Sequence, residues 1–228
     1  MRRQDLTYGL GKAVPIVLGY IPIGFAFGVL AHEAGLSIGE ILAMSVLVFA
    51  GSSQFIAVAM LQAGAGIGSI VATAFIVNLR QLLFSASITP YLKGYSAPKL
   101  ALLSYELTDE SFAVAMGEFA NDKQNNQFLW GLFPPCHAAW ALSTVLGALV
   151  GNLIPDPGAF GLDYALTAMF ICLLIFQVKD RVALLTALVA AAAGIGIYLL
   201  LPGRWNIIIA TILAATVGVG AEKWLKST

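Results

Sequence analysis

Charged residues are scarce in this sequence: only 11% of its 228 residues are Asp, Glu, Lys or Arg, against about 25% in soluble domains. Hydrophobic residues make up 59% of the chain, and its mean hydropathy is +0.87. Apolar runs long enough to cross a bilayer recur without the alternating pattern of a membrane β-barrel. These features exclude a soluble protein and predict an all-α integral membrane protein.

Motifs for enzyme chemistry and for nucleic-acid binding are also missing. Twelve basic residues balance twelve acidic ones and form no basic patch, so no nucleic-acid partner is predicted. No His-x-x-x-His, Gly-x-Ser-x-Gly or P-loop lysine occurs, which argues against a metal or serine intramembrane enzyme and an ATP-driven pump. Cys136 and Cys172 lie in apolar runs without metal-type spacing, so we expect buried thiols. No catalytic residue, metal or cofactor is expected.

About eight hydrophobic segments are expected to be helical, at 13–31, 41–61, 67–90, 100–119, 128–153, 160–178, 182–201 and 205–221. The linkers are too short for a soluble domain, so residues 1–228 are predicted to form one polytopic membrane domain. The longest polar run, 121–127, separates possible half-repeats at 1–120 and 121–228. Such a repeat would be inverted if three segments of each half cross the membrane, and parallel if four cross.

The first segment carries signals for orientation and for packing. Arg2, Arg3 and Lys12 precede it, so the positive-inside rule places the N-terminus in the cytoplasm. The polar stretch that ends at Lys12 is short and lacks a cleavage site, so no cleavable signal peptide is expected. Gly24 and Gly28 form a small-xxx-small pair, which favours close contact with another helix.

Six or eight segments can cross the membrane. Eight cross if every segment spans, which the apolar length of 41–61 favours. Six cross if 41–61 is re-entrant and 100–119 lies at the surface. The positive-inside rule favours six, because Lys93 and Lys99 then join the other basic residues inside. Both arrangements place both termini in the cytoplasm.

The centre of segment 41–61 is polar where a lipid-facing helix would be apolar. Within the stretch 49–55 it contains Gly51, Ser52, Ser53 and Gln54. Backbone at membrane depth must satisfy its hydrogen bonds internally or line a protected cavity, and broken helices of this kind form substrate sites in transporters. The alternative is a continuous helix whose small residues allow close packing.

Arg80 lies near the centre of segment 67–90, two residues after Asn78. A charge at the bilayer centre costs at least about 2.5–3.5 kcal/mol, so Arg80 should face the protein interior and meet an anion. That anion could be a substrate carboxylate. The alternative is a permanent ion pair with an acidic residue of segment 100–119 that only holds helices together.

Segment 100–119 carries Glu106, Asp109 and Glu110, which on a continuous helix fall within about a third of the circumference. Such a cluster can accept a proton, bind an ammonium group or neutralise an arginine; the alternative is a solvated face of a surface helix. His137 is expected to be a neutral, hydrogen-bonded core histidine, with a proton relay as the alternative. An apolar pocket could be walled by Phe27, Phe55, Phe84 and Trp140, although packing explains these rings equally well.

Four motifs in order, FAGSSQF at 49–55, NLRQLLFS at 78–85, LTDESFA at 107–113 and ALTAMF at 165–170, resemble the AzlC-type branched-chain amino-acid exporter family. Members are large subunits of two-component bacterial exporters. The resemblance implies export of leucine, isoleucine and valine, with methionine or toxic analogues as further candidates. It also implies a small AzlD-type membrane partner and the bacterial cytoplasmic (inner) membrane. Gln81 departs from the family, in which a histidine is often expected there.

Together, the residues and the resemblance predict a proton-coupled secondary transporter. The predicted substrate-binding residues are Gly51, Ser52, Ser53, Gln54, Asn78 and Arg80, with a helix end after Gly51 for the substrate carboxylate. The predicted proton-coupling or ammonium-binding residues are Glu106, Asp109, Glu110 and His137. Two other classes remain open at this point: a non-transporting assembly or regulatory subunit, and an ion channel or carrier.

Overall fold

A computed structural model describes residues 3–120, 126–151, 180–200 and 205–227, with isolated positions between 153 and 178. These residues form helices and no strand, which confirms the predicted all-α class. The chain divides into two compact units, Met1–Met169 and Phe170–Thr228, and each is described by itself. The single membrane domain and its half-repeats stay predictions.

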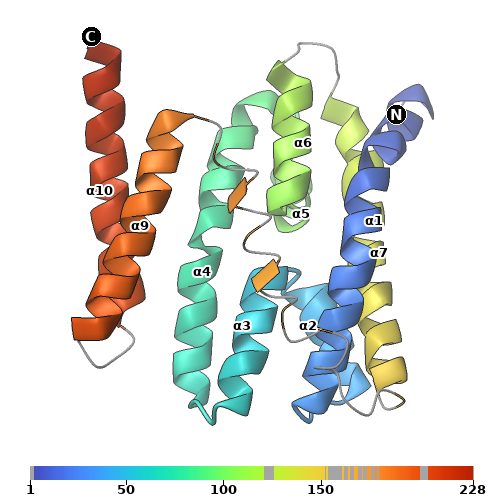
Figure 1. Ribbon diagram of the computed structural model, residues 1–228. Helices are drawn as coiled ribbons and strands as arrows, with labels where there is room; N and C mark the ends of the chain where they lie inside the picture. The colour runs from blue at the N-terminus through green and yellow to red at the C-terminus, as the bar shows by residue number, and fades with distance from the viewer. Residues whose placement is uncertain are drawn as a thin grey trace. The chain divides into compact units, whose positions relative to one another are not determined.

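Among the described residues, three helices are long and apolar enough to cross a bilayer, and all belong to the first unit. They are α1 (Arg3–Glu33), α4 (Ile67–Ile88), which the 3₁₀ turn η1 (Thr89–Tyr91) extends, and α7 (Leu129–Gly151), which follows η2 (Asn126–Phe128). In Figure 1, α1 and α7 run in one direction and α4 runs in the other. These helices confirm the predicted segments 13–31, 67–90 and 128–153.

Helices α1 and α7 approach each other so closely that only glycine fits at the contact. A Cβ atom on Gly28 would lie 2.0 Å from the Thr144 carbonyl oxygen, and one on Gly147 would lie 2.0 Å from the Phe25 carbonyl oxygen. On Gly24 it would lie 2.1 Å from Ser143 Oγ. The structure thus confirms that the small-xxx-small pair of α1 mediates close helix contact.

The predicted segment 41–61 is broken, as expected. Helix α2 (Ile38–Leu47) begins at a capping box made by Ser37 and Glu40, and α3 (Gly51–Gln62) follows after three residues. The chain turns at Phe49, whose φ of 43° is the only positive value among the described non-glycine residues. Figure 1 shows α3 returning toward the end at which α2 began, so the pair forms a re-entrant hairpin.

Segment 100–119 is also broken, and its prediction as one continuous helix was wrong. It consists of α5 (Ala97–Tyr105) and α6 (Asp109–Ala120). The cause is a reciprocal cap: the Ser111 N–H donates to Thr108 Oγ1 at 3.2 Å, and the Thr108 N–H donates to Ser111 Oγ at 2.9 Å. These bonds satisfy N–H groups at a new helix start, so α6 begins where α5 was expected to continue.

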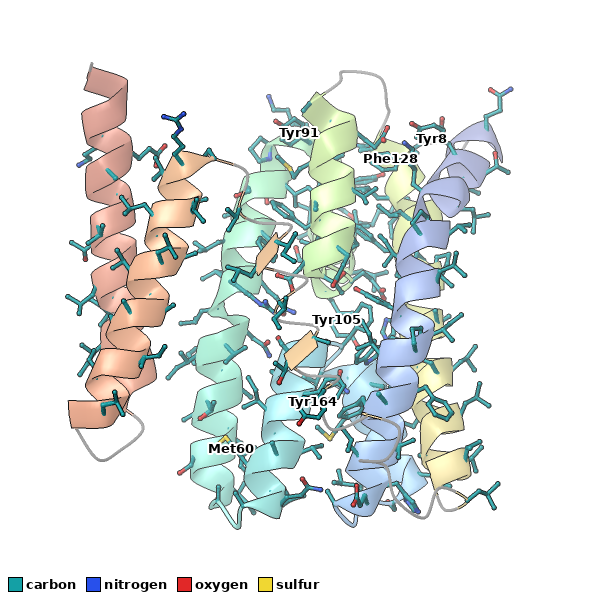
Figure 2. All side chains as sticks on the ribbon, viewed as in Figure 1. Tyr8, Met60, Tyr91, Tyr105, Phe128 and Tyr164 are labelled. Carbon is teal, nitrogen blue, oxygen red and sulfur yellow. The ribbon has the colours of Figure 1, made fainter. Side chains whose placement is uncertain are left out.

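Helices α5 and α6 form a second hairpin, and the tips of the two hairpins are the turns 48–50 and 106–108. The two hairpins enter the first unit from opposite ends. In Figure 2, Tyr8, Tyr91 and Phe128 lie at one end, Met60 lies at the other, and Tyr105 at the end of α5 lies between them. A helix of about ten residues is about 15 Å long, half the thickness of the hydrocarbon core. The hairpin tips therefore meet about half-way along the spanning helices. Segment 100–119 is not a surface helix.

The second unit contains a pair of packed helices, α9 (Arg181–Leu200) and α10 (Trp205–Ser227). Their contact is close at Gly218, where a Cβ atom would lie 2.7 Å from Thr186 Oγ1. Both predicted segments, 182–201 and 205–221, are confirmed as helices. Segment 160–178 falls mostly outside the described residues, and Cys172 lies outside them.

Candidate functional site

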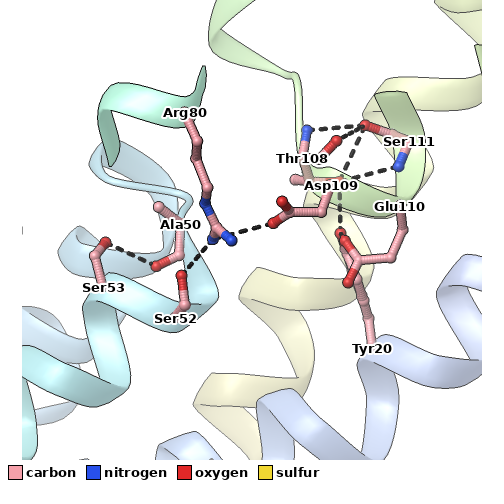
Figure 3. A network of polar contacts seen from close by, with 9 residues as sticks. All are labelled: Tyr20, Ala50, Ser52, Ser53, Arg80, Thr108, Asp109, Glu110 and Ser111. Atoms are coloured by element: carbon pink, nitrogen blue, oxygen red, sulfur yellow. Dashed lines mark hydrogen bonds and ion pairs between the residues drawn. The ribbon is translucent and has the colours of Figure 1, made fainter. Parts of the chain in front are cut away.

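Arg80 joins the two hairpin tips (Figure 3). From the middle of α4 its Nη2 atom lies 3.0 Å from Asp109 Oδ2, at the first residue of α6, and donates to the hydroxyl of Ser52 on α3. The Arg80 and Asp109 side chains are 26% and 15% exposed, respectively. Of the two anions expected for Arg80, the structure shows the carboxylate of its own chain.

The contact between the two hairpin tips, here called the tip contact, leaves some polar atoms without a hydrogen-bond partner among the described residues. Arg80 Nε and Asp109 Oδ1 are buried and have no hydrogen-bond partner among the described residues. The N-cap residue of α3, Ala50, offers no side-chain hydrogen bond, although a helix start has N–H groups that need acceptors. A ligand that carries both an anion and a cation would satisfy both kinds of group.

The three acidic residues of the second hairpin are divided between the end of α5 and the first turn of α6. Each has a different partner: His137 Nδ1 for Glu106, at 3.0 and 3.1 Å; Arg80 for Asp109; and the Tyr20 hydroxyl for Glu110, at 2.7 Å. Their predicted placement on one helix face is wrong, because the break after α5 separates the first of them from the other two. The solvated-face alternative is wrong as well, because the first two side chains are only 14% and 15% exposed.

His137 lies between the two tips and contacts both. Its Nδ1 atom meets Glu106, and its ring stacks on Phe49 with centroids 4.0 Å apart and planes 8° apart. A positive φ at a non-glycine residue costs roughly 1–2 kcal/mol, and a ring pair contributes about 0.5–1.5 kcal/mol. The stack therefore offsets much of the strain at Phe49. The structure shows the hydrogen-bonded core histidine, and its proton relay stays a prediction.

A chain of buried hydrogen bonds fixes α2 and α3 against α7. Trp140 Nε1 donates to Gln54 Oε1 at 3.0 Å, Gln54 Nε2 donates to Ser45 Oγ at 3.3 Å, and Ser45 Oγ lies 2.9 Å from Thr144 Oγ1. The Trp140 ring also covers Gly51, where a Cβ atom would lie 2.9 Å from Cη2. Gln54, predicted to contact substrate, is therefore engaged by Trp140 and Ser45 here.

We expect Gln54→Leu to destabilise the folded protein by about 1–3 kcal/mol, because the buried Trp140 N–H loses its acceptor. Thermal unfolding in detergent, followed by tryptophan fluorescence, would measure the change. The matched control is Gln62→Leu, at the exposed end of the same helix, where a surface substitution should change stability by less than about 0.5 kcal/mol. Equal midpoints for the two variants would contradict the role assigned to the buried chain.

Three of the four predicted pocket rings meet beside the start of α3. The Phe27 ring packs edge-on against Phe55, with centroids 5.3 Å apart, and stacks on Trp140 at 6.2 Å. All three side chains are buried. Phe84 instead stacks on Phe112 at 4.4 Å, one helical turn beyond the ion pair on the same two helices.

The substrate-binding role of Asn78 stays a prediction, and Tyr20 is a site residue that the sequence analysis does not predict. Asn78 precedes Arg80 by two residues and so lies on a different face of α4, with its Oδ1 buried and unpartnered among the described residues. Tyr20 was not singled out, yet its hydroxyl lies 2.6 Å from Thr108 Oγ1 as well as beside Glu110. A phenol in the middle of an apolar spanning segment is the signal that could have identified it, since a buried hydroxyl needs a partner.

Residues 15–154 match a family model described as AzlC protein. The chain belongs to the AzlC family. The matched region runs from α1 to the end of α7, so the AzlC match includes both hairpins and every residue of the tip contact. No solved structure matches the chain.

Curated relatives of this AzlC-family chain are membrane and transport proteins. An uncharacterized membrane protein of Archaeoglobus fulgidus is 37% identical over 79% of this chain and 78% of its own. The inner membrane protein YgaZ of Escherichia coli is 32% identical over 83% of this chain and 81% of its own length. The branched-chain amino acid transport protein AzlC of Bacillus subtilis is 29% identical over 72% of this chain and 64% of its own length.

Proposed function

We propose that this chain exports branched-chain amino acids from the cytoplasm, driven by proton entry, as the large subunit beside a small AzlD-type membrane protein. Its proposed substrates are leucine, isoleucine and valine, with methionine as a further candidate. Its proposed location is the bacterial inner membrane, with both termini in the cytoplasm. The observation that carries the proposal is the Arg80–Asp109 ion pair between two re-entrant hairpins.

An amino-acid zwitterion can enter this ion pair without leaving a charge uncompensated. The substrate carboxylate would take Arg80 and the uncapped start of α3, and the ammonium group would take Asp109. Removing one partner of a buried ion pair costs about 3–5 kcal/mol. A zwitterion avoids that cost because one ion pair becomes two. A plain carboxylate or a plain ammonium would leave Asp109 or Arg80 unpaired.

The preference for aliphatic side chains is assigned to the rings beside the start of α3. Phe27, Phe55 and Trp140 pack together there, and Trp140 lies against Gly51. Each methylene group that a substrate buries against such a wall contributes about 0.8 kcal/mol. Valine, leucine and isoleucine would therefore bind better than glycine or alanine. In the present state these rings fill the space themselves, so binding requires them to move apart.

The moving parts are assigned to the hairpins. Helices α1 and α7 cannot slide past each other, because their glycines bring backbone against backbone. The α2–α3 hairpin enters from one end of the unit and the α5–α6 hairpin from the other, so displacing one or the other would open the tip contact to opposite sides in turn. Arg80 would hold the tips together when no substrate is bound.

Leucine uptake into liposomes tests the proposal. The full chain is reconstituted with and without the small partner, and labelled leucine competes with three unlabelled compounds. These are isoleucine, leucinamide, which lacks the carboxylate, and 4-methylpentanoate, which lacks the ammonium group. Isoleucine should compete well. A loss of about 3 kcal/mol makes each of the other two more than about a hundredfold weaker.

The outcomes separate the competing functions. Leucine transport that needs the partner, by a chain that binds no leucine itself, would favour a non-transporting subunit. Ion flux that leucine does not change would favour an ion channel or carrier. Competition by leucinamide as strong as that by isoleucine would refute the zwitterion site.

A further inference from the structure

Glu110 differs from the other two carboxylates of the α5–α6 tip because its partner is a tyrosine hydroxyl, which cannot carry a positive charge as an imidazole or a guanidinium can. Glu106 faces the imidazole of His137, and Asp109 faces Arg80. Glu110 accepts a hydrogen bond from the Tyr20 hydroxyl at 2.7 Å, and no cation lies within ion-pair distance of it among the described residues. A carboxylate at this depth has two ways to be neutralised: binding a proton or binding an ammonium group.

Tyr20 belongs to the fixed part of the unit. The residue is only 6% exposed, its ring packs edge-on against Trp140 with centroids 5.4 Å apart, and its carbonyl accepts from Ser143 Oγ on α7. Its neighbour four residues on, Gly24, is one of the close contacts between α1 and α7. The phenol thus reaches from the rigid helix pair to the first turn of α6.

A tyrosine hydroxyl can hold a carboxyl group in either protonation state. It donates to the ionised carboxylate, and it can accept from the protonated acid. The Thr108 hydroxyl lies 2.6 Å from the Tyr20 hydroxyl. It can donate a hydrogen bond to the Tyr20 oxygen or accept one from the Tyr20 O–H. Glu110 can therefore gain or lose a proton while it stays bound to α1, which a lysine or arginine partner would not allow.

We infer that Glu110 carries the coupled proton and that Tyr20 is the residue that positions it, an inference that rests on the proposed export function. Glu110 takes a proton from the outer side when the site is empty, and releases it to the cytoplasm before substrate binds. Substrate itself stays on the Arg80–Asp109 pair.

Other ionisable groups near Glu110 are already assigned. On α7, the buried Cys136 thiol donates to the Leu132 carbonyl oxygen at 3.1 Å, and His137 is engaged by Glu106 of α5. On its own helix, Asp109 is paired with Arg80 of α4. Tyr20 is the group that α1 directs at it.

Accumulation of leucine in liposomes under a pH gradient tests the inference, with the full chain, the small partner and the membrane potential clamped at zero. A gradient of about one unit, acid inside, should concentrate leucine about tenfold in wild type if one proton exchanges for one substrate. Glu110→Gln should give no accumulation, and its leucine exchange at equal pH should no longer vary with pH. The control is Glu40→Gln. Glu40 is an exposed residue of a capping box in which glutamine can take the place of glutamate, so this variant should behave as wild type.

Tyr20→Phe tests the positioning role and keeps the inference open to refutation if Glu110→Gln fails to fold. It keeps the ring but removes the donor to the carboxylate, so the pH of half-maximal exchange should move upward by about one unit. Tenfold accumulation by Glu110→Gln, or an unchanged pH profile in Tyr20→Phe, would overturn the inference. Absence of leucine exchange in wild type would instead refute the proposed function.

Discussion

Replacing Arg80 with alanine should abolish leucine transport and destabilise the protein by about 3–5 kcal/mol, because Asp109 is left buried without its cation. Its effect on transport follows from the site, since Arg80 both contacts the α3 start at Ser52 and pairs with Asp109. Initial rates of leucine uptake in liposomes and thermal unfolding in detergent measure the two effects. Lys93→Ala, at an exposed position, is the control and should leave both unchanged.

A double variant separates stability from function. Arg80→Gln combined with Asp109→Asn removes both charges, so no uncompensated charge remains and much of the lost stability should return. Transport should stay absent, since neither the carboxylate nor the ammonium group of a substrate finds its partner. If the double variant transports leucine at the wild-type rate, the ion pair only holds helices together.

The second large effect is expected for Gly28→Leu, a substitution that should prevent normal assembly of the first unit. A Cβ atom there would lie 2.0 Å from the Thr144 carbonyl oxygen, so α1 and α7 would have to separate. Overpacking of this kind typically costs about 1–3 kcal/mol, and more where backbone must shift. The yield of monodisperse protein and its unfolding midpoint in detergent should both fall sharply.

Gly19→Leu is the matched control for that variant. It makes the same substitution on the same helix, at an exposed position where a Cβ atom meets nothing within 4 Å. Its yield and midpoint should stay close to wild type. Equal losses in both variants would show that α1 tolerates no added bulk anywhere, rather than that the α1–α7 contact requires glycine.

The sequence predicts one helix break and misses the other for a physical reason. At 49–55 a glycine and three polar residues interrupt an apolar run, so the conflict with a lipid-facing helix is visible. Thr108 and Ser111 cause the second break by capping each other. Their pattern lacks the glutamate or glutamine that usually marks a capping box, and the acidic residues beside them also occur inside helices. A broken helix and an unbroken one were therefore hard to distinguish there.

Partners of the buried charges depend on tertiary contacts that a single sequence does not display. Arg80 was predicted to face inward, and the structure confirms it, because the cost of an isolated charge in a membrane depends little on context. Which carboxylate it meets depends on where α6 starts. The bond between Tyr20 and Glu110 joins residues 90 positions apart, and local periodicity carries no information on such a pair.

Helix α3 extends only part-way through the first unit, and in the proposed transporter this bears on the leakage of protons. Its N-terminal end lies part-way through the first unit, with no side-chain cap and with Arg80 beside it at Ser52. A helix start carries about half a positive charge, and the positive ends of half-helices in pores repel protons and other cations. At α6 that charge is offset by Asp109 and Glu110 in the first turn. In the proposed transporter, the tip of the first hairpin would therefore attract a substrate carboxylate and repel protons and other cations, so that the proton gradient would not dissipate along the substrate path.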